Sequence, residues 1–215
     1  MNGMQLGIAI GAVGLAFSAG VSAQQTEGSW MVRARAVNLG MDNSNSAGQA
    51  PLAALPADSI SVNDKTIPEA DITYFFTPNI AAELVLTVPQ KQNVTINALG
   101  IGAVGTFKHL PPTLTLQYHF APTATVRPYI GAGINYTRIS GVSLSAGPGA
   151  TLGLENDSTG LALQAGLDYK LSGNMFLNFD IKKIYIQSDV TLNGAKISTL
   201  KLDPLAIGVG VGWRF

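Results

Sequence analysis

The chain contains no cysteine, and its two histidines are His109 and His119. The lack of cysteine excludes disulfide bonds and thiolate metal sites. Charged residues are also scarce, at 12% of the chain, whereas about 25% is usual in soluble domains. The formal net charge is zero. Without excess positive charge there is no electrostatic basis for binding nucleic acid, and we expect no nucleic-acid partner.

After the first 23 residues, no apolar run is long enough for a transmembrane helix. The run at residues 6–21 ends in Val21-Ser22-Ala23 and is followed by polar QQTEGS. This pattern is typical of a secretory signal peptide cut after Ala23, although no Lys or Arg precedes the run. A buried or membrane helix is the alternative. We therefore expect a signal peptide at 1–23 and one mature domain at 24–215.

Large apolar residues alternate with small or polar ones in eight segments of the mature chain. Alternation with a period of two predicts β-strands. In the last segment, LAIGVGVGWRF, one face is large and apolar and the other is mostly glycine. The segments are 29–37, 68–76, 80–87, 110–120, 127–137, 160–171, 175–186 and 205–215.

The connections between these segments alternate in length. Short, turn-rich links lie near Thr77, Pro122 and Gly173. Bacterial outer-membrane barrels have short periplasmic turns and long outer loops, and in lipid the sheet must close. The sequence therefore predicts an all-β, eight-stranded antiparallel transmembrane β-barrel in contact with outer-membrane lipid and lipopolysaccharide. The four long connections, expected to be loops, are 38–66, 88–109, 138–159 and 187–202.

The same alternation directs charged side chains into the barrel, in equal numbers of each sign. Unpaired buried charges are costly, so we expect these residues to pair and to close at least part of the lumen. A conduction filter is the alternative interpretation. The predicted interior charge network consists of Arg33, Arg35, Glu69, Asp71, Glu83, Asp168, Lys170, Asp180, Lys182 and Arg214.

The chain offers little for catalysis. No serine accompanies either histidine within its segment, so a serine hydrolase site is not expected. His109 and His119 are ten positions apart on one predicted strand, about 33 Å, and cannot share a metal ion. We place them at the outer and inner rims, solvated or hydrogen-bonded. The sequence thus predicts no enzyme, no metal and no cofactor.

The segments HLPPTLTLQYHF and RPYIGAGINYT and the ending GVGWRF closely resemble the OmpW family of outer-membrane proteins, from about Gly28 to Phe215. The resemblance implies an eight-stranded barrel whose outer part holds a hydrophobic channel. It also implies passive uptake of small hydrophobic compounds, and in some members a role as a colicin receptor or in stress responses. The C-terminal aromatic residue Phe215, with Trp213 on the same face, is implied to be the signal for the barrel-assembly machinery.

The long connections carry apolar residues that suggest a channel mouth. No charge lies between Lys91 and Lys108. Exposed apolar residues in a loop usually form a binding surface, although they could equally cover the barrel mouth as a cap. The predicted apolar mouth consists of Leu52, Leu55, Leu99, Ile101, Val104 and Phe107.

Prolines interrupt two neighbouring predicted strands near that mouth. Pro89 ends one strand, and Pro111 and Pro112 begin the next. Proline lacks the N–H that a sheet ladder needs, so pairing there is weak. A solute could leave sideways between these strands, or the prolines could only shape the loop.

Two functions remain open from sequence alone. The first is a passive conduit for small hydrophobic solutes. The second is a non-transporting barrel that serves as an adhesin, a phage or colicin receptor, or a stabiliser of the envelope.

Overall fold

The structure, a computed structural model, describes residues 27–215. The expected signal peptide at 1–23 lies outside the described residues. Within 27–215, no helix is long and apolar enough to cross a membrane.

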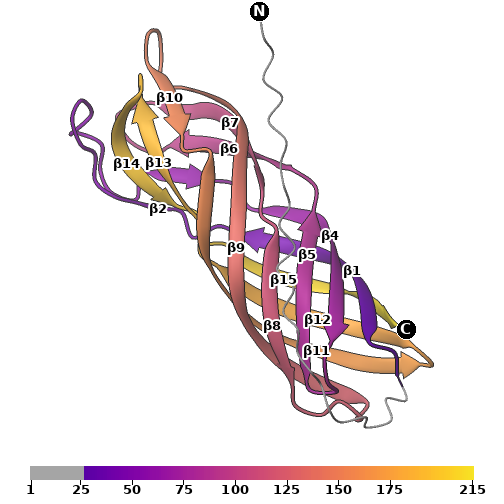
Figure 1. Cartoon of the computed structure of the whole chain (residues 1–215). Helices are drawn as coiled ribbons and strands as arrows, with labels where there is room; N and C mark the ends of the chain where they lie inside the picture. Colours follow the sequence, from indigo (N-terminus) through magenta and orange to yellow (C-terminus); the bar gives the residue numbers. More distant parts are fainter. Residues whose placement is uncertain (1–26) are drawn as a thin grey trace, which may run out of the picture.

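Eight antiparallel strands close into a barrel, which confirms the predicted fold (Figure 1). Each strand pairs with the next in chain order, and the last pairs with the first. Three tight turns join them at one end, around residues 76–79, 120–125 and 173–174. The barrel strands are β1 (Trp30–Gly40), β4 (Lys65–Phe75), β5 (Ile80–Thr87), β8 (Thr113–His119), β9 (Val126–Ser145), β11 (Asp157–Ser172), β12 (Met175–Ile184) and β15 (Leu205–Arg214).

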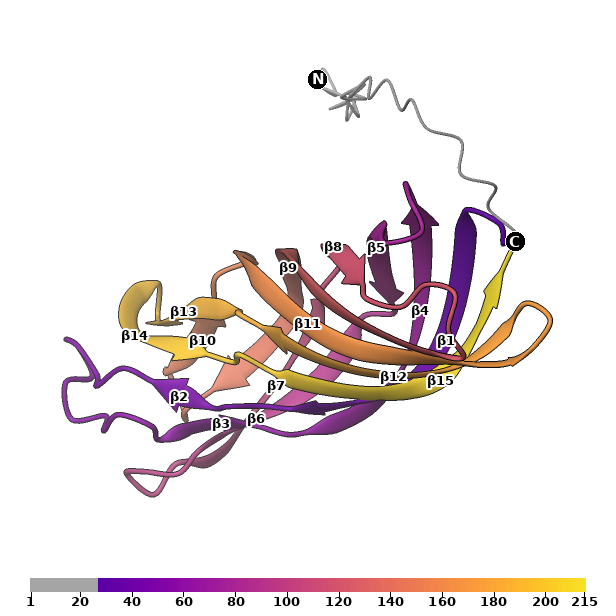
Figure 2. The same ribbon diagram turned by 90° about the horizontal axis from the view of Figure 1, so that it is seen from below.

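The four long connections are not loops, contrary to the prediction. They contain further strands that extend the barrel at the end opposite the tight turns (Figure 2). β9 alone runs on to Ser145, well past the expected end at residue 137. The additional strands are β2 (Ser44–Asn45), β3 (Ile60–Val62), β6 (Gln90–Ile96), β7 (Gly102–Leu110), β10 (Thr151–Leu154), β13 (Gln187–Leu192) and β14 (Ala195–Lys201).

The prediction failed because polar side chains occupy both faces at the start of this extension. In β6, Gln90 and Gln92 point inward and Lys91 points outward, so the hydrophobic alternation is hidden. The segment predicted as one strand at 110–120 is also divided. β7 ends at Leu110 and β8 begins at Thr113, because Pro111 and Pro112 cannot donate to a ladder.

The first and last strands close the barrel through a complete ladder. Beyond that ladder, the Trp30 N–H donates to the carbonyl of Phe215 at 2.9 Å, and the Phe215 N–H donates back to the Trp30 carbonyl at 2.8 Å. The start of β1 and the C-terminal residue Phe215 therefore lie at the end of the barrel that carries the tight turns, which is the periplasmic side of an outer-membrane barrel.

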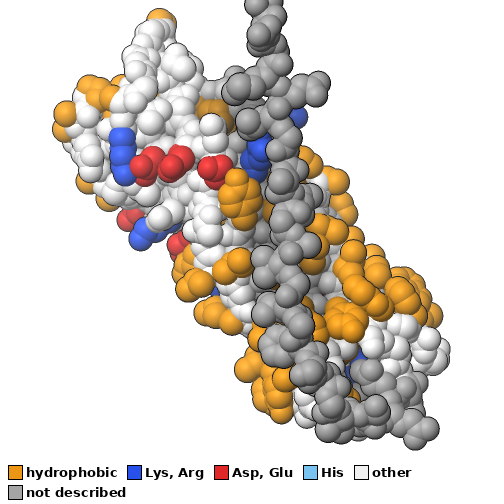
Figure 3. Space-filling model, viewed as in Figure 1, with side chains coloured by type: hydrophobic (Ala, Val, Ile, Leu, Met, Phe, Trp, Pro, Cys, Tyr) orange, Lys and Arg blue, Asp and Glu red, His pale blue; other side chains and the backbone are white. Residues whose placement is uncertain are grey.

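The outer surface of the eight-strand part is apolar. Alternate side chains such as Leu116, Ile134 and Leu161 are well exposed there, and apolar side chains cover this part in Figure 3. Aromatic pairs mark the periplasmic end, as in Trp30–Tyr74, with ring centroids 4.8 Å apart. Such a surface is suited to lipid, with the aromatic belt at the interface.

The extension has the opposite character, with a more polar outside and an apolar interior. Its strands follow the order β3–β6–β7–β9–β10–β13–β14–β2. Where β2 meets β3, the Asn43 and Asn45 side chains accept hydrogen bonds from the Val62 and Ile60 N–H groups, at 2.7 and 2.8 Å. The interior holds what we call the outer apolar cluster, which includes Leu55, Val94, Val104, Phe107, Ile139, Ile186, Ile197 and Leu200.

Candidate functional site

The interior of the membrane-spanning part is filled by a polar network centred on two arginines of β1. Arg33 is fully buried and reaches across the barrel. Its guanidinium donates to Asp168 of β11 at 2.7 and 3.2 Å and to Glu83 of β5 at 2.8 Å. It also donates to the Thr73 hydroxyl of β4 at 2.6 Å. One side chain thereby links four strands.

Arg35 forms the second centre, one inward position closer to the outer end. Its guanidinium lies 2.6 Å from Asp71, 3.1 Å from Glu69 and 3.2 Å from Glu83. It is also 3.3 Å from Asp180 on the other side of the barrel. Four carboxylates thus surround one cation, and the excess negative charge needs a further positive group.

Lys182 supplies that group. Its ammonium lies 2.9 Å from Asp180 and 3.0 Å from Glu69. Gln164 completes the arrangement by donating to Glu83 at 2.8 Å and to Asp180 at 2.7 Å. Every member of this layer is almost fully buried. The layer leaves no room for an aqueous channel, because its side chains bond one another across the barrel.

Glycines of β15 make room for the arginine stems. Gly208, Gly210 and Gly212 face the interior opposite Val37, Arg35 and Arg33. A Cβ atom at Gly210 would lie 2.7 Å from the Arg35 Cγ and 2.0 Å from the Ala34 carbonyl oxygen. The bare face seen in the sequence therefore accommodates the charge network in a narrow barrel.

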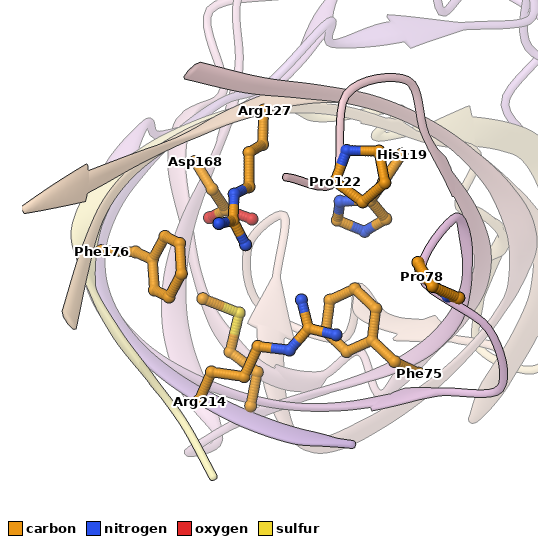
Figure 4. Close-up of a pocket in the computed structure, with 9 residues that line it drawn as sticks. Phe75, Pro78, His119, Pro122, Arg127, Asp168, Phe176 and Arg214 are labelled. Carbon is orange, nitrogen blue, oxygen red and sulfur yellow. The ribbon is translucent and has the colours of Figure 1, made fainter. Parts of the chain in front are cut away.

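A second ionic cluster closes the periplasmic mouth (Figure 4). Arg127 and Arg214 point toward the barrel axis there, and Arg214 lies over the Phe75 ring at 3.7 Å. Glu27 accepts hydrogen bonds from Arg127, Arg214 and Lys170, with the Arg127 Nη2 at 2.9 Å. The cavity that remains, about 10 Å³, has room for about one water molecule.

The structure thus distributes the predicted charged residues over two layers. Arg33, Arg35, Lys182 and the predicted carboxylates form the central layer, while Lys170 and Arg214 belong to the periplasmic cluster. Sequence reasoning missed Arg127 and Glu27. Arg127 is the first residue of the predicted strand 127–137 and has the inward parity of Tyr129, so the alternation alone could have identified it. Glu27 precedes the first strand and carries no such signal.

The predicted apolar mouth is mostly interior. Leu55, Val104 and Phe107 are buried in the outer apolar cluster, and Leu52 and Ile101 pack against it. Only Leu99 is strongly exposed, at 53%. The segment 46–59, which we call the lid loop, places Leu55 in the outer apolar cluster, and its Gly48 N–H donates to the Leu55 carbonyl at 2.7 Å. Most of these residues therefore belong to the apolar interior and not to an exposed surface.

Both histidines are buried, so neither lies at a solvated rim, and His119 has the hydrogen bond that was the other expected state. They also lie on different strands, β7 and β8. His119 stacks on Tyr129 with ring centroids 4.9 Å apart, and its Nε2 lies 3.1 Å from the Gln117 Oε1. His109 faces the interior just inside the outer apolar cluster.

The three prolines lie where the barrel wall loses its ladder. Pairing of β5 with β8 stops at Val85–Thr113, and pairing resumes only at Gln90–His109 between β6 and β7. Val88 in this gap is 58% exposed. We call this gap the proline seam.

A second interruption faces a different pair of strands. Beyond the pair Ala162–Ile184, and within the described residues, only two hydrogen bonds cross to β11, from the Tyr185 N–H to the Leu161 carbonyl and from the Gln187 N–H to the Ser158 hydroxyl, next to a recess of about 270 Å³. Ile186 lines this recess and also belongs to the outer apolar cluster. The wall therefore has two places where the apolar interior approaches the outside.

We expect Arg35→Met to lower the free energy of unfolding by about 3–5 kcal/mol, because Asp71 loses its cation and four carboxylates lose a shared one. Unfolding of the refolded barrel in urea, followed by the heat-modifiable gel band, measures this. Lys196→Met is the matched control, since its pair with Asp189 is at the surface. That variant should cost less than about 1 kcal/mol. Equal effects of the two substitutions would contradict the central role of Arg35.

The periplasmic cluster predicts a dependence on pH. The hydrogen bond from Arg127 lowers the pKa of Glu27 from 4.5 to about 2. The ionised carboxylate therefore stabilises the fold fully above pH 4.5, and this contribution is lost as the pH falls toward 2. Glu27→Gln should unfold at a lower temperature than the wild type at pH 7, and the difference should vanish near pH 2. Glu155→Gln, at the exposed outer end, should show no such difference. A Glu27→Gln deficit that persists at the acidic limit would exclude this cause.

Comparison with known proteins agrees with this architecture. The family model described as the OmpW family matches residues 26–215. The chain is 40% identical to an uncharacterized outer-membrane protein, y4mB, of Sinorhizobium fredii, over 86% of this chain and 80% of that protein. It is 34% identical to outer membrane protein W of Vibrio cholerae, over 73% of this chain and 76% of that protein.

Among solved structures, the outer membrane protein OprG from Pseudomonas aeruginosa superposes with a TM-score of 0.77 at 26% identity, covering 88% of this chain and 97% of that one. The relatives and structural neighbours are outer-membrane barrels, and the protein is located in the bacterial outer membrane. On the evidence of the family match and the closed barrel, the chain belongs to the OmpW family of outer-membrane proteins.

Proposed function

We propose that the protein provides passive uptake of small hydrophobic molecules across the outer membrane. The observation that carries the proposal is the change of the barrel interior along its axis. The membrane-spanning part holds ions bonded to one another, whereas the extension beyond the apolar surface holds the outer apolar cluster. An apolar interior that opens away from the cell lowers the barrier for a solute that lipopolysaccharide excludes.

The entrance in this account is the lid loop. Leu55 is 1% exposed and completes the outer apolar cluster from above. A solute that displaced Leu55 would replace apolar contacts with similar ones, so the exchange costs little. The charged layer below offers no such exchange, because an apolar solute there would separate paired charges.

The exit is sideways through the proline seam. Pro89, Pro111 and Pro112 supply no N–H groups, so the strands can part there without breaking ladder hydrogen bonds. The exposed Val88 leads from the seam onto the lipid-facing surface. A solute would thus leave into the outer membrane without passing the charged layer.

A non-transporting surface barrel, such as a colicin or phage receptor, an adhesin or an envelope stabiliser, is the competing proposal. The packed interior favours it, because Leu55 and Phe107 leave the outer opening filled. Barrel-assembly machinery would be a partner in either case, with Phe215 in position at the periplasmic end to be recognised.

Uptake of a hydrophobic fluorescent tracer distinguishes the two. Cells that produce the protein should accumulate the tracer several-fold faster than cells with an empty vector, and faster still with Leu55→Ala, which loosens the cap. Cells that produce Arg35→Met at the same folded level serve to check that any leak through the charged layer is separate. Identical rates with and without the wild-type barrel would favour the non-transporting function.

The exit is tested by disulfide staples, for which the cysteine-free chain is a clean background. Cysteines at the facing pairs Leu84–Leu114 and Lys91–Lys108 flank the proline seam on both sides. Oxidation should slow tracer uptake severely, and reduction should restore it. A control staple at Leu163–Lys183 flanks the recess beside Ile186 instead and should leave uptake unchanged. Inhibition by the control staple alone would move the exit to that recess.

A further inference from the structure

Two buried polar side chains lie between the charged layer and the outer apolar cluster without partners. Gln92 has no exposed surface, and His109 is 2% exposed. Among the residues that the structure describes, none forms a hydrogen bond with the Gln92 Nε2 or Oε1, or with the His109 Nδ1. An unpaired buried amide is costly, so a purely structural role would favour leucine at position 92.

The two side chains belong to one face of a paired hairpin. β6 and β7 align Gln90 with His109 and Gln92 with Phe107. Gln92 and His109 are therefore diagonal neighbours, with backbones about 7–8 Å apart. The Phe107 ring lies 6.0 Å from the His109 ring, and Val94 is the next inward residue on β6. Polar groups thus border directly on an apolar wall.

Other interior glutamines of this barrel are satisfied. Gln90, on the same strand and equally buried, donates to the Val88 carbonyl at 2.8 Å. Gln164 bonds two carboxylates and accepts from Thr115 and Gln117. Gln92 differs from both in what surrounds it, because its strand neighbours on the outer side are apolar.

We propose that Gln92 and His109 bind the polar head of an amphiphilic solute whose hydrocarbon chain packs in the outer apolar cluster. This inference rests on the proposed uptake function and names its solute class. The amide of Gln92 both donates and accepts, which matches the hydroxyl of an alkanol. A charged head fits less well, because the adjoining wall is apolar and the ions below are already paired. An alkane would leave the amide unpaired.

The site lies beside the proline seam. Gln90 and His109 form the first ladder pair on its outer side, and Gln92 is the next inward residue. A solute held there by its head group would therefore be retained immediately before the exit. The site would favour monofunctional amphiphiles over pure hydrocarbons of the same length.

Displacement of a hydrophobic fluorescent tracer from the full barrel in nanodiscs tests the proposal, with 1-octanol and n-octane as competitors. The wild type should bind 1-octanol about tenfold more tightly than n-octane relative to their partition into empty nanodiscs, the factor that one retained hydrogen bond supplies. Gln92→Leu should abolish this preference and leave n-octane binding unchanged. Gln90→Leu is the matched control and should keep the preference.

The outcomes separate the two proposals. Equal relative affinity for the two competitors in the wild type, or a preference that survives Gln92→Leu, would overturn the head-group site while leaving uptake intact. Failure of both competitors to displace tracer from the wild type would overturn the uptake function, and the site with it. His109→Phe provides an independent variant, should Gln92→Leu not fold, and should reduce the preference in the same direction.

Discussion

The ion pairing of Arg33 and Arg35 is the constraint on which the rest of the barrel depends. Two guanidinium groups in the centre of a narrow barrel would be very costly alone, and each is surrounded by carboxylates from other strands. Because the partners come from β4, β5, β11 and β12, the network fixes the register of strands far apart in the chain. β15 contributes no charge to the central layer and instead provides glycine, without which the arginine stems would not fit.

In the proposed uptake function, this network also limits where a solute can pass. Inside the lipid-facing part, the wall is apolar on the outside and ionic on the inside, and in the extension both relations are reversed. A hydrophobic molecule entering from outside therefore meets an apolar interior first and a charged floor second. Above that floor the ladder is interrupted at the proline seam and is weakened at the recess beside Ile186. The arrangement is better suited to sideways release than to passage through the barrel.

The sequence predicted the barrel and which side chains of its strands face inward, because one rule, alternation with a period of two, applies wherever one face of a strand meets lipid. The same rule placed Arg33, Arg35 and Lys182 in the interior. It failed beyond the membrane, where both faces of a strand can be polar, as Gln90 and Lys91 show. It also could not place Glu27, whose position depends on tertiary contacts with Arg127 and Arg214. The burial of His109 and Leu55 depends on how the extension closes, which no local pattern encodes.

The central claim is that the barrel is closed to ions along its axis yet open to apolar solutes from its outer end. The most direct test uses one preparation of the wild-type protein oriented in a planar bilayer and in vesicles. Ion conductance across the bilayer and transfer of a hydrophobic tracer from the outer solution into the vesicle membrane are measured at the same protein density. The account predicts tracer transfer well above that of protein-free vesicles, with no conductance above the bare bilayer. A steady ion conductance in the intact barrel, or tracer transfer no faster than in protein-free vesicles, would contradict it.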